Sequence, residues 1–355
     1  MRVFPLAMIL SLATTLMWLG WSTVPAEAGI PGIREVIDNL AGADQDQSQE
    51  QGQSAEPAGI FGGLCDPGDC GPRWIIAADA VALQRSTTQS QALFINRIGT
   101  TDTAPVDAKD VDFPVAYGPS LSVIRRGPCD WDLEVAYFQF DGFSARATVP
   151  GQSVMVTDAN GGFFATDAQA TYTSALYSVE LNVRRQWTDW LNLLAGFRWG
   201  QLNERYHADG TGTFVAVPVS LDVNAFNHLY GLQVGANAEV YNMGGPLRID
   251  ALCKAGIYVN SARQIDRRFV EGFVDQSVAA ERNQTAFIGE VGAVATYALT
   301  RHVAFHASAQ VAWLEGVALA PEQIGATDFT AGTAGVDAGG ELFYVGGGLG
   351  FEFRY

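Results

Sequence analysis

The chain has 355 residues, a formal net charge of −17 at pH 7, 17% charged residues and 39 glycines. This length is enough for one large β domain or two ordinary domains. A protein that binds nucleic acid needs a basic footprint, so the acidic balance argues against that class of function.

The first residues have the pattern of a secretion signal. Met1-Arg2 is a short positive start, Val3 to Gly20 is an apolar run, and Ala26-Glu27-Ala28 is a cleavage site of the A-x-A type. We therefore predict a signal peptide over residues 1–28 and a mature chain that begins at Gly29. Export through the inner membrane also permits disulfides.

Residues 29–72 are predicted to be a leader that is disordered where Gln, Asp, Glu and Ser accumulate. The Asp-Pro-Gly turn between Cys65 and Cys70 is able to bring these two cysteines together. Cys129 lies in another turn, which we expect at the same rim as Cys70. A Cys65–Cys70 disulfide is the first expectation and Cys70–Cys129 the second, because connectivity does not follow from sequence.

From Arg73 to the end, the chain alternates between segments of strand period and loops. The last segment is the clearest, because Leu349, Phe351, Phe353 and Tyr355 fall on one face and the residues between them are glycine or charged. The ten predicted strands are Arg73–Gln84, Val115–Ile124, Trp131–Phe140, Thr171–Trp187, Trp190–Leu202, Phe226–Tyr241, Leu247–Asn260, Thr285–Leu299, Val303–Leu314 and Leu342–Tyr355.

The connections between these strands alternate between short and long. Short turns are expected near residues 127–130, 188–189, 242–246 and 300–302, and long loops over 85–114, 141–170, 203–225, 261–284 and 315–341. This is the layout of an outer-membrane barrel, with short periplasmic turns and long outer loops. We predict an all-β fold over residues 73–355, an antiparallel up-and-down transmembrane β-barrel of about ten strands. Eight or twelve strands stay open as alternatives.

Aromatic residues support the same fold, because they recur at two levels of the predicted outward face. Such levels are the aromatic girdles of a membrane barrel. The periplasmic girdle would contain Trp74, Trp131, Trp187, Tyr297 and Tyr355, and the outer girdle Tyr137, Trp199 and Trp313.

Five segments resemble a bacterial family of outer-membrane β-barrel porins. They are Trp74-Ile-Ile-Ala-Ala-Asp-Ala80, Glu180-Leu-Asn-Val-Arg-Arg185, Leu194-Ala-Gly-Phe-Arg198, Asn227-His-Leu-Tyr-Gly-Leu-Gln233 and Lys254-Ala-Gly-Ile-Tyr258. The resemblance covers roughly Trp74 to Tyr355 and implies an exported barrel in the bacterial outer membrane. The chain end also resembles the closing strand that the barrel-assembly machinery of such proteins reads. The matching motifs are structural and bring no catalytic residue with them.

Charged side chains of both signs fall on the predicted inward face. Counting residues across the short turns places three polar pairs level on adjacent strands, namely Glu180 with Arg198, Glu239 with Arg248, and Gln233 with Lys254. A ten-stranded barrel is only slightly wider than the eight-stranded kind that side chains fill. We therefore expect a narrow, largely plugged lumen, in which the charge pairs form either a static plug or a gate.

Candidates for catalysis are weak. His207 and Asp209 open the third long loop, in which a barrel protease would carry a His-Asp pair, but no paired acidic residues accompany them. His306 and Ser308 have a spacing that outer-membrane phospholipase also has, but the surrounding motif is missing. We predict no catalytic residue, metal or cofactor, and a barrel hydrolase is only the alternative.

The sequence thus favours an outer-membrane barrel with outer-membrane lipid and the barrel-assembly machinery as its partners. The predicted function is a narrow, porin-like channel for small solutes or ions. The alternative is a non-conducting structural or surface-interaction barrel that acts through its long extracellular loops.

Overall fold

The computed structural model describes residues 74–86, 90–98, 101–127, 131–156 and 162–355, with side chains for all of these except 96–98, 101–105 and 152. The predicted signal peptide (1–28) and leader (29–72) lie outside the described residues, as does Cys129. Within the described part of the chain, no helix is long and apolar enough to span a membrane.

Strands make up nearly all of the described structure. The strands are β1 (Trp74–Arg85), β2 (Ala92–Ile98), β3 (Thr101–Asp107), β4 (Ala116–Arg126), β5 (Trp131–Val156), β6 (Phe163–Thr188), β7 (Leu191–Gly212), β8 (Pro218–Asn242), β9 (Leu247–Val270), β10 (Val274–Ala298), β11 (Val303–Val317), β12 (Thr327–Asp328), β13 (Thr333–Ala334) and β14 (Gly340–Arg354). The short helices are η1 (Ala108–Asp110), α3 (Ala320–Gln323) and η2 (Ile324–Ala326).

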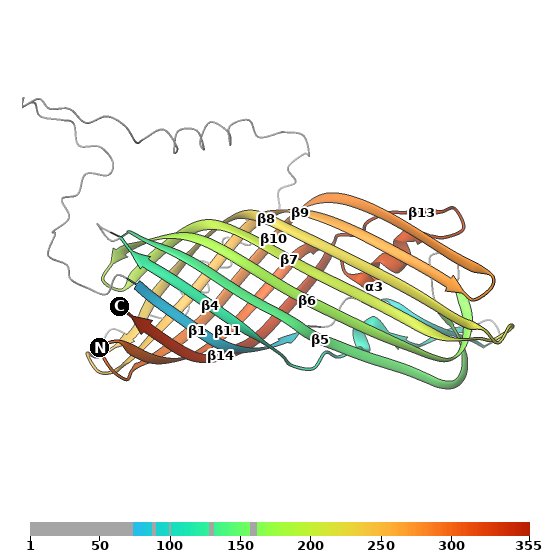
Figure 1. Cartoon of the computed structure of the whole chain (residues 1–355), viewed down its shortest axis with the longest axis horizontal. Helices are drawn as coiled ribbons and strands as arrows, with labels where there is room; N and C mark the ends of the chain where they lie inside the picture. Colours follow the sequence, from blue (N-terminus) through green and yellow to red (C-terminus); the bar gives the residue numbers. More distant parts are fainter. Residues whose placement is uncertain (1–73, 87–89, 99–100, 128–130, 157–161) are drawn as a thin grey trace, which may run out of the picture. The chain divides into compact units, whose positions relative to one another are not determined.

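Ten of these strands close into a ring. Their order is β5-β4-β1-β14-β11-β10-β9-β8-β7-β6, and β6 pairs back to β5. Every neighbouring pair is antiparallel, and each predicted strand lies in one strand of the ring. The backbones of Trp74 and Tyr355 exchange two hydrogen bonds of 2.9 Å, so β1 begins and the chain ends at the same rim (Figure 1). The predicted ten-stranded antiparallel barrel is confirmed.

Side chains alternate between the lumen and the outside along each strand of the ring. On β6, Val179, Leu181 and Val183 are exposed on the outside, whereas Glu180 and Asn182 are buried inside. This is the alternation that a pleated strand imposes on successive residues. The hydrophobic effect therefore selects opposite chemistry for the two faces of one strand.

The outward side chains form an apolar belt around the half of the barrel that has the short turns. On β7 they are apolar from Leu191 to Trp199 and polar from Gln201 onward. The same change falls between Tyr230 and His228 on β8 and between Val259 and Ser261 on β9. A closed ring with an outward apolar band is the form in which strands span lipid. The fold is a transmembrane β-barrel.

Aromatic side chains lie at both edges of this apolar belt. The residues Trp74, Trp131, Trp187, Tyr297 and Tyr355 face outward near the rim with the short turns, and Tyr137, Trp199 and Trp313 face outward at the opposite edge. The closing-strand residues Leu349, Phe351, Phe353 and Tyr355 also face outward, within the belt.

The wall continues well beyond the belt on strands β5 to β10 (Figure 1). Unbroken long loops were expected over 141–170, 203–225 and 261–284, and this expectation is wrong, because most of these residues extend the strands. Above the belt the outward residues become polar, but Tyr172, Tyr206 and Val223 still point inward and are buried. Beyond the belt, buried side chains still recur at every second residue on the inner face. The outer face there is polar, so the sequence does not show the alternation of apolar and polar residues that marks a membrane strand.

The first and last long loops also carry structure. Residues 85–114 contain β2, which pairs with the outer end of β5 through Phe94 and Val156, and β3, which pairs with β2. Residues 318–339, between β11 and β14, contain α3, η2, β12 and β13 and are called the inward loop below.

The belt predicts different costs for a charge at two outward positions of β8. Val234→Arg should lower the free energy of unfolding by about 2–4 kcal/mol, because Val234 is 58% exposed within the apolar belt. Ser220→Arg, on the same face but beyond the belt, should change it by less than about 0.5 kcal/mol. Unfolding in denaturant from lipid vesicles measures both, and equal losses would contradict the assigned belt.

Candidate functional site

The interior of the barrel, at the level of the belt, is occupied by charged side chains. Six of them form a central network, composed of Glu134, Glu180, Arg184, Arg198, Lys254 and Glu290. Each lies at an inward position of β5, β6, β7, β9 or β10, so strand alternation aims all of them into the lumen.

Contacts within the central network cross the lumen between strands that are not neighbours. Arg198 on β7 places Nη1 2.5 Å from Oε1 of Glu290 on β10. Lys254 on β9 places Nζ 2.7 Å from Oε2 of Glu180 on β6. The same oxygen of Glu180 accepts a 2.7 Å hydrogen bond from Nε2 of Gln233. The network therefore links strands β6 to β10 across the inside of the wall and occupies the lumen beside them.

The central network is neutral and almost fully buried. It contains three carboxylates and three cations, and the side chains of Glu180 and Arg198 are each only 4% exposed. Charges taken out of water are tolerated only when they are paired and hydrogen-bonded. Arg198 meets this condition with Glu290, with Glu180 at 3.5 Å and with the Ser178 hydroxyl at 2.8 Å.

Two of the three predicted pairs do not form. Glu180 is the register partner of Arg198. Gln233, however, lies opposite Gly256, so Lys254 reaches across the lumen to Glu180. The predicted pairing of Gln233 with Lys254 is therefore wrong.

The pairing of Glu239 with Arg248 is also wrong. Glu239 lies opposite Asp250, and Arg248 pairs with Asp250 of its own strand at 2.8 Å. Beside the turn between β8 and β9, Asn242 pairs with Arg248, so the turn contains more residues than the count across it assumed. The bulge between Glu239 and Tyr241 then shifts the register by one residue, which a residue count does not contain either.

A second buried ion pair lies where the first strand leaves the belt. Arg85 Nη1 is 2.7 Å from Oε1 of Glu204, and both side chains have no exposed surface. The Arg85 guanidinium also lies over the rings of Phe113 and Tyr172, at 4.5 and 5.0 Å from their centroids. Cation–π contacts and the carboxylate together compensate a cation that would otherwise be costly to bury.

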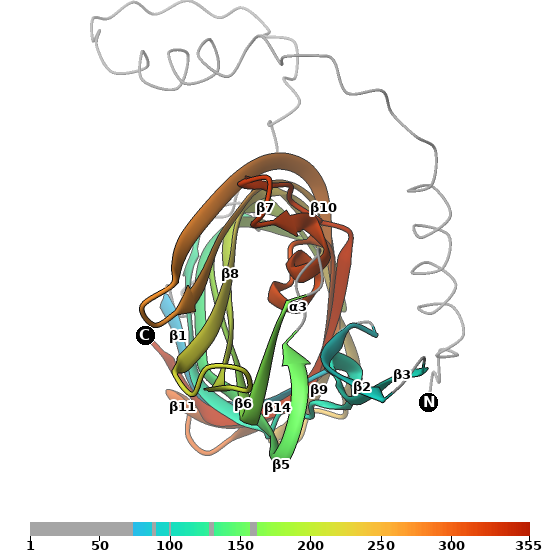
Figure 2. The ribbon, with the colours of Figure 1, turned by 90° about the vertical axis from the view of Figure 1, so that its right-hand side faces the viewer.

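The inward loop fills the lumen above these charges. Viewed along the barrel, α3 lies inside the ring of strands (Figure 2). Leu319 and Gln323 are fully buried, and Ile324 and Phe329 nearly so. Gly316 starts the entry into the lumen, because its φ of 79° and a register shift at this point turn the chain away from the β11 ladder.

Side chains of the wall satisfy the backbone of the inward loop. Asn227 on β8 donates to the carbonyl of Ala318 at 2.8 Å and accepts from its amide at 2.7 Å. Oε2 of Glu204 accepts from the amide of Ala320 at 3.1 Å. Asn260 on β9 donates to the carbonyl of Gly316 at 2.9 Å, at the end of β11 where the chain turns toward the inward loop. Buried backbone groups need hydrogen-bond partners, and the side chains of the wall supply them to this loop.

His306 lies at an inward position of β11 within the belt. Its Nε2 is 3.0 Å from Oδ1 of Asp79 on β1. The Ser308 hydroxyl accepts from the amide of Gly348 at 3.0 Å, so it is engaged with the β14 backbone. His306 and Ser308 thus both face the lumen, and each contacts a different partner.

His207 and Asp209 lie on the outer face of β7, beyond the belt. Nδ1 of His207 is 2.9 Å from Oδ1 of Asp222 and its Nε2 is 3.5 Å from Asp209, while Arg205 is 2.8 Å from the same Asp222 oxygen. The hydrogen bond with Asp222 raises the pKa of His207 and lowers the pKa of Asp222. The group is an ion-pair cluster on the outer wall and does not face the lumen.

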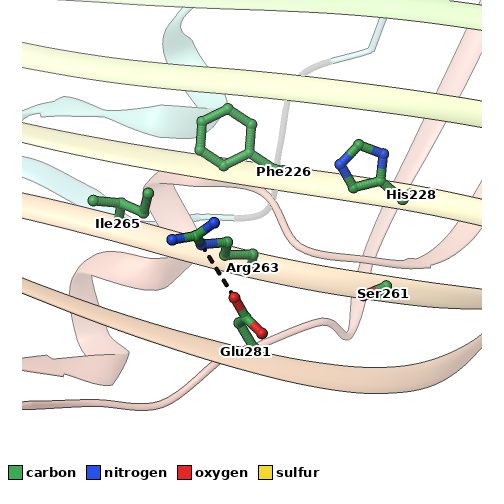
Figure 3. Close-up of a pocket in the computed structure, with 6 residues that line it drawn as sticks. All are labelled: Phe226, His228, Ser261, Arg263, Ile265 and Glu281. Atoms are coloured by element: carbon green, nitrogen blue, oxygen red, sulfur yellow. Dashed lines mark ion pairs between the residues drawn. The ribbon is translucent and has the colours of Figure 1, made fainter.

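A shallow pocket of about 370 Å³ also lies on the outer face of β8, β9 and β10 (Figure 3). Arg263 and Glu281 form an ion pair of 3.3 Å across it, and both side chains are more than half exposed. It is lined by Phe226, His228, Ser261, Arg263, Ile265 and Glu281.

Cysteine chemistry is described at one position only. Cys253 on β9 is a free, partly buried thiol. Cys65, Cys70 and Cys129 lie outside the described residues, so the disulfide stays a prediction.

No protein-family model matches the chain, and no curated protein sequence matches it significantly. Among solved structures, the chain is similar to the outer membrane protease OmpT from Escherichia coli, with 9% identity and a TM-score of 0.45 over 79% of this chain and 96% of that one. It is also similar to the translocator domain of the autotransporter NalP from Neisseria meningitidis, with 11% identity and a TM-score of 0.39 over 82% and 91% of the two chains. A third is the P. putida toluene transporter TodX, with 9% identity and a TM-score of 0.32 over 80% and 90%. These are bacterial outer-membrane β-barrels, and the scores are too low to assign a function or a site to this chain.

Sequence reasoning missed the inward loop, the Arg85–Glu204 pair and Glu290. The inward parity of Glu290 on β10 was readable, since Val291 and Ala293 lie on the other face. Its partner Arg198 was not readable, because two strands of the ring, β8 and β9, lie between the two residues in the sequence.

Removal of one charge should reveal how tightly the central network is coupled. Glu180→Gln should lower the free energy of unfolding by about 3–5 kcal/mol. The variant leaves the buried Lys254 ammonium without its carboxylate and removes one of the two carboxylates that pair with Arg198. Adding Lys254→Met should recover part of that loss in a double-mutant cycle. Arg263→Met is the control and should cost less than about 1 kcal/mol, because both side chains of its ion pair with Glu281 are more than half exposed. A mild Glu180→Gln variant with no coupling to Lys254 would contradict the network.

The outer ion-pair cluster predicts the titration of His207. Asp222→Asn should lower the pKa of His207 toward 6.5, since the hydrogen bond with Asp222 is the largest cause of its shift. Asp209→Asn should lower it less, because that contact is 3.5 Å. NMR titration of labelled histidine in micelles measures both pKa values, and an equal response to the two variants would contradict the assigned hydrogen bond.

Proposed function

We propose that the protein is a bacterial outer-membrane barrel that acts as a narrow, gated channel for small polar solutes, and that its described conformation is the closed one. The observation that carries the proposal is a loop that enters the lumen of a wall that is complete without it. Val317 and Gly340 are register partners at the ends of β11 and β14, so residues 318–339 contribute nothing to the ring of strands.

The attachment of the inward loop supports a gate. Its polar contacts to the wall are made by side chains such as Asn227, Glu204 and Gln264. Single hydrogen bonds of this kind contribute only about 0.5–1.5 kcal/mol each, because water replaces them when they break. Moving the loop also exposes buried apolar side chains such as Leu319 and Ile324, at about 1.5–3 kcal/mol each, but it leaves the strand ladder of the wall intact.

The central network would form a second barrier below the inward loop. Gln233 and Lys254 both contact Oε2 of Glu180, so the loss of one contact leaves the carboxylate with another partner. Three carboxylates and three cations balance at this level. A passage lined in this way favours small polar solutes without a strong preference for either sign of charge.

The location in the outer membrane rests on the apolar belt together with the predicted signal peptide. Outer-membrane lipid would cover the belt, and the exposed aromatic end of β14 suits recognition by the barrel-assembly machinery.

A second candidate function is contact with another surface through the hairpin tips. The tip between β7 and β8 exposes Phe214 at 84%, and the tip between β9 and β10 exposes Phe273 at 68%. Large apolar side chains are unusual at the tips of solvated hairpins, and exposed apolar groups often mark interaction sites.

Deletion of the inward loop tests the gate. Residues 318–339 are replaced by Asn-Gly, which can form a two-residue hairpin turn between Val317 and Gly340. In planar bilayers, the intact protein should be nearly silent, and the deletion should give stable conductance steps that are at least about tenfold more frequent.

The matched control shortens a hairpin that lies outside the lumen. Residues 212–217 are replaced by Asn-Gly, because Thr211 and Pro218 are register partners. This variant should stay silent in bilayers, and a loss of binding to surfaces would instead favour the second candidate. Correctly folded, heat-modifiable deletion protein that does not conduct would refute the gate.

A further inference from the structure

One carboxyl group at the contact between the inward loop and the wall lacks the partner that a buried charge needs. Asp266 points into the lumen from β9, well beyond Val259, where the apolar belt ends on that strand. The residue has 0% exposure. It therefore lies outside the membrane-spanning part of the wall and is shielded from water by the inward loop.

The contacts of Asp266 join wall and loop. The Thr327 hydroxyl, at the start of β12 in the inward loop, donates to Oδ2 of Asp266. Nε2 of Gln264, on the same face of β9, donates to this oxygen at 3.0 Å and to the Thr327 hydroxyl at 2.8 Å. Oδ1 of Asp266 is buried and has no hydrogen-bond partner.

The neighbours on the wall give Asp266 no compensating charge. Its register partners are Val223 on β8 and Val278 on β10. Arg268, next on its face of β9, donates to Gln276 at 2.8 Å and lies over the Phe329 ring at 5.0 Å. Among the described residues, no ion pair joins Asp266 to a cation.

The loop side gives no cation either. Asp328 follows Thr327 and is itself acidic. Arg282 on β10 points toward the loop and donates to the carbonyl of Val336 at 3.4 Å. Burial consequently raises the pKa of Asp266 from 3.8 to about 7, although the hydrogen bond from Thr327 and the nearby Asn224 backbone amide oppose the rise.

We propose that Asp266 is a proton-operated latch, which holds the inward loop in the lumen when its carboxyl is neutral and releases it when the carboxyl is ionised. A neutral acid keeps the bonds from Thr327 and Gln264 on Oδ2 and carries no charge that needs a cation or water. An ionised carboxylate at the same position has no cation and would need water, which only displacement of the loop supplies. The latch concerns the loop itself, and its effect on conduction rests on the proposed channel function.

The direction of the pH dependence follows from the two protonation states. The closed state binds the proton with a pKa of about 7, and an open, solvated Asp266 with one near 3.8. Between these values, the closed state holds a proton that the open state lacks, so opening becomes easier as pH rises through this window. Above the closed-state pKa the effect is complete. The loop should thus be held most tightly at acidic pH.

Hydrogen exchange of the inward loop tests the latch without reference to conduction. Protection of the Ala318 and Ala320 amides is measured in the folded, full-length protein in micelles, with the intrinsic exchange rates corrected for pH. The opening equilibrium should rise about thirtyfold between roughly pH 5.5 and roughly pH 8.5 in the wild-type protein. Asp266→Asn mimics the neutral acid and should keep the acidic level of protection at both pH values.

Two further variants sharpen the result. Thr327→Val removes a bond that favours the carboxylate, so the midpoint of the transition should move to higher pH. Asp275→Asn is the control, because Asp275 is an exposed hairpin carboxylate paired with Arg267, and it should leave the transition unchanged. A wild-type loop with equal protection at both pH values, or an Asp266→Asn protein that keeps the transition, would overturn the latch.

Conductance measured at the same two pH values separates the two proposals. Steps that are frequent at alkaline pH, rare at acidic pH and absent in Asp266→Asn support both the latch and the channel. A silent bilayer at both pH values, together with the expected exchange transition, refutes the channel and leaves the latch in place.

Discussion

The structure depends on one constraint, which is that backbone polar groups facing lipid have no water to bind. A strand ring meets this constraint only if it closes, and here the first strand, β1, pairs with the last, β14. Closure brings both ends of the described wall to one rim and creates an interior. The apolar belt and the enclosed charges are the two consequences, because alternate residues of the same strands face lipid and lumen.

Polar groups inside the barrel are also shielded from water and need partners from the protein. Charges such as Glu180 and Arg198 are buried in a space too narrow for bulk water, so they reach across the lumen for partners. The inward loop likewise carries backbone groups into a dry space, and it needs Asn227 and Asn260 to satisfy them. Asp266 is the exception, since it is enclosed without a cation. Ladder bonds hold the wall, whereas separate side-chain bonds and buried apolar side chains hold the loop, so the loop is able to move without breaking the ladder.

Much of the wall could be predicted from the sequence, because within the belt apolar residues that face lipid alternate with polar residues that face the lumen. Val179, Leu181 and Val183 alternate with polar residues, and the aromatic girdles mark where that pattern ends. Beyond the belt, polar residues such as Gln169 and Arg205 occupy the outward positions, so the sequence predicts loops there. The inward positions of Ala170 and Tyr206 were present in the sequence but had no apolar outer face beside them.

The sequence by itself determined the fold class, the order of the strands around the ring and which residues face lipid, because neighbouring strands in an up-and-down barrel are neighbours in the chain. It predicted about ten strands and left eight or twelve open. Only the tertiary structure decided which charges meet inside. Arg198 and Glu290 are 92 residues apart and pair through the lumen, and Asn227 meets Ala318 across 91 residues. Such contacts depend on closure, on a bulge between Glu239 and Tyr241 that shifts the register, and on a loop that folds inward. None of these leaves a local pattern in the residues, because each is set by how the finished ring encloses space.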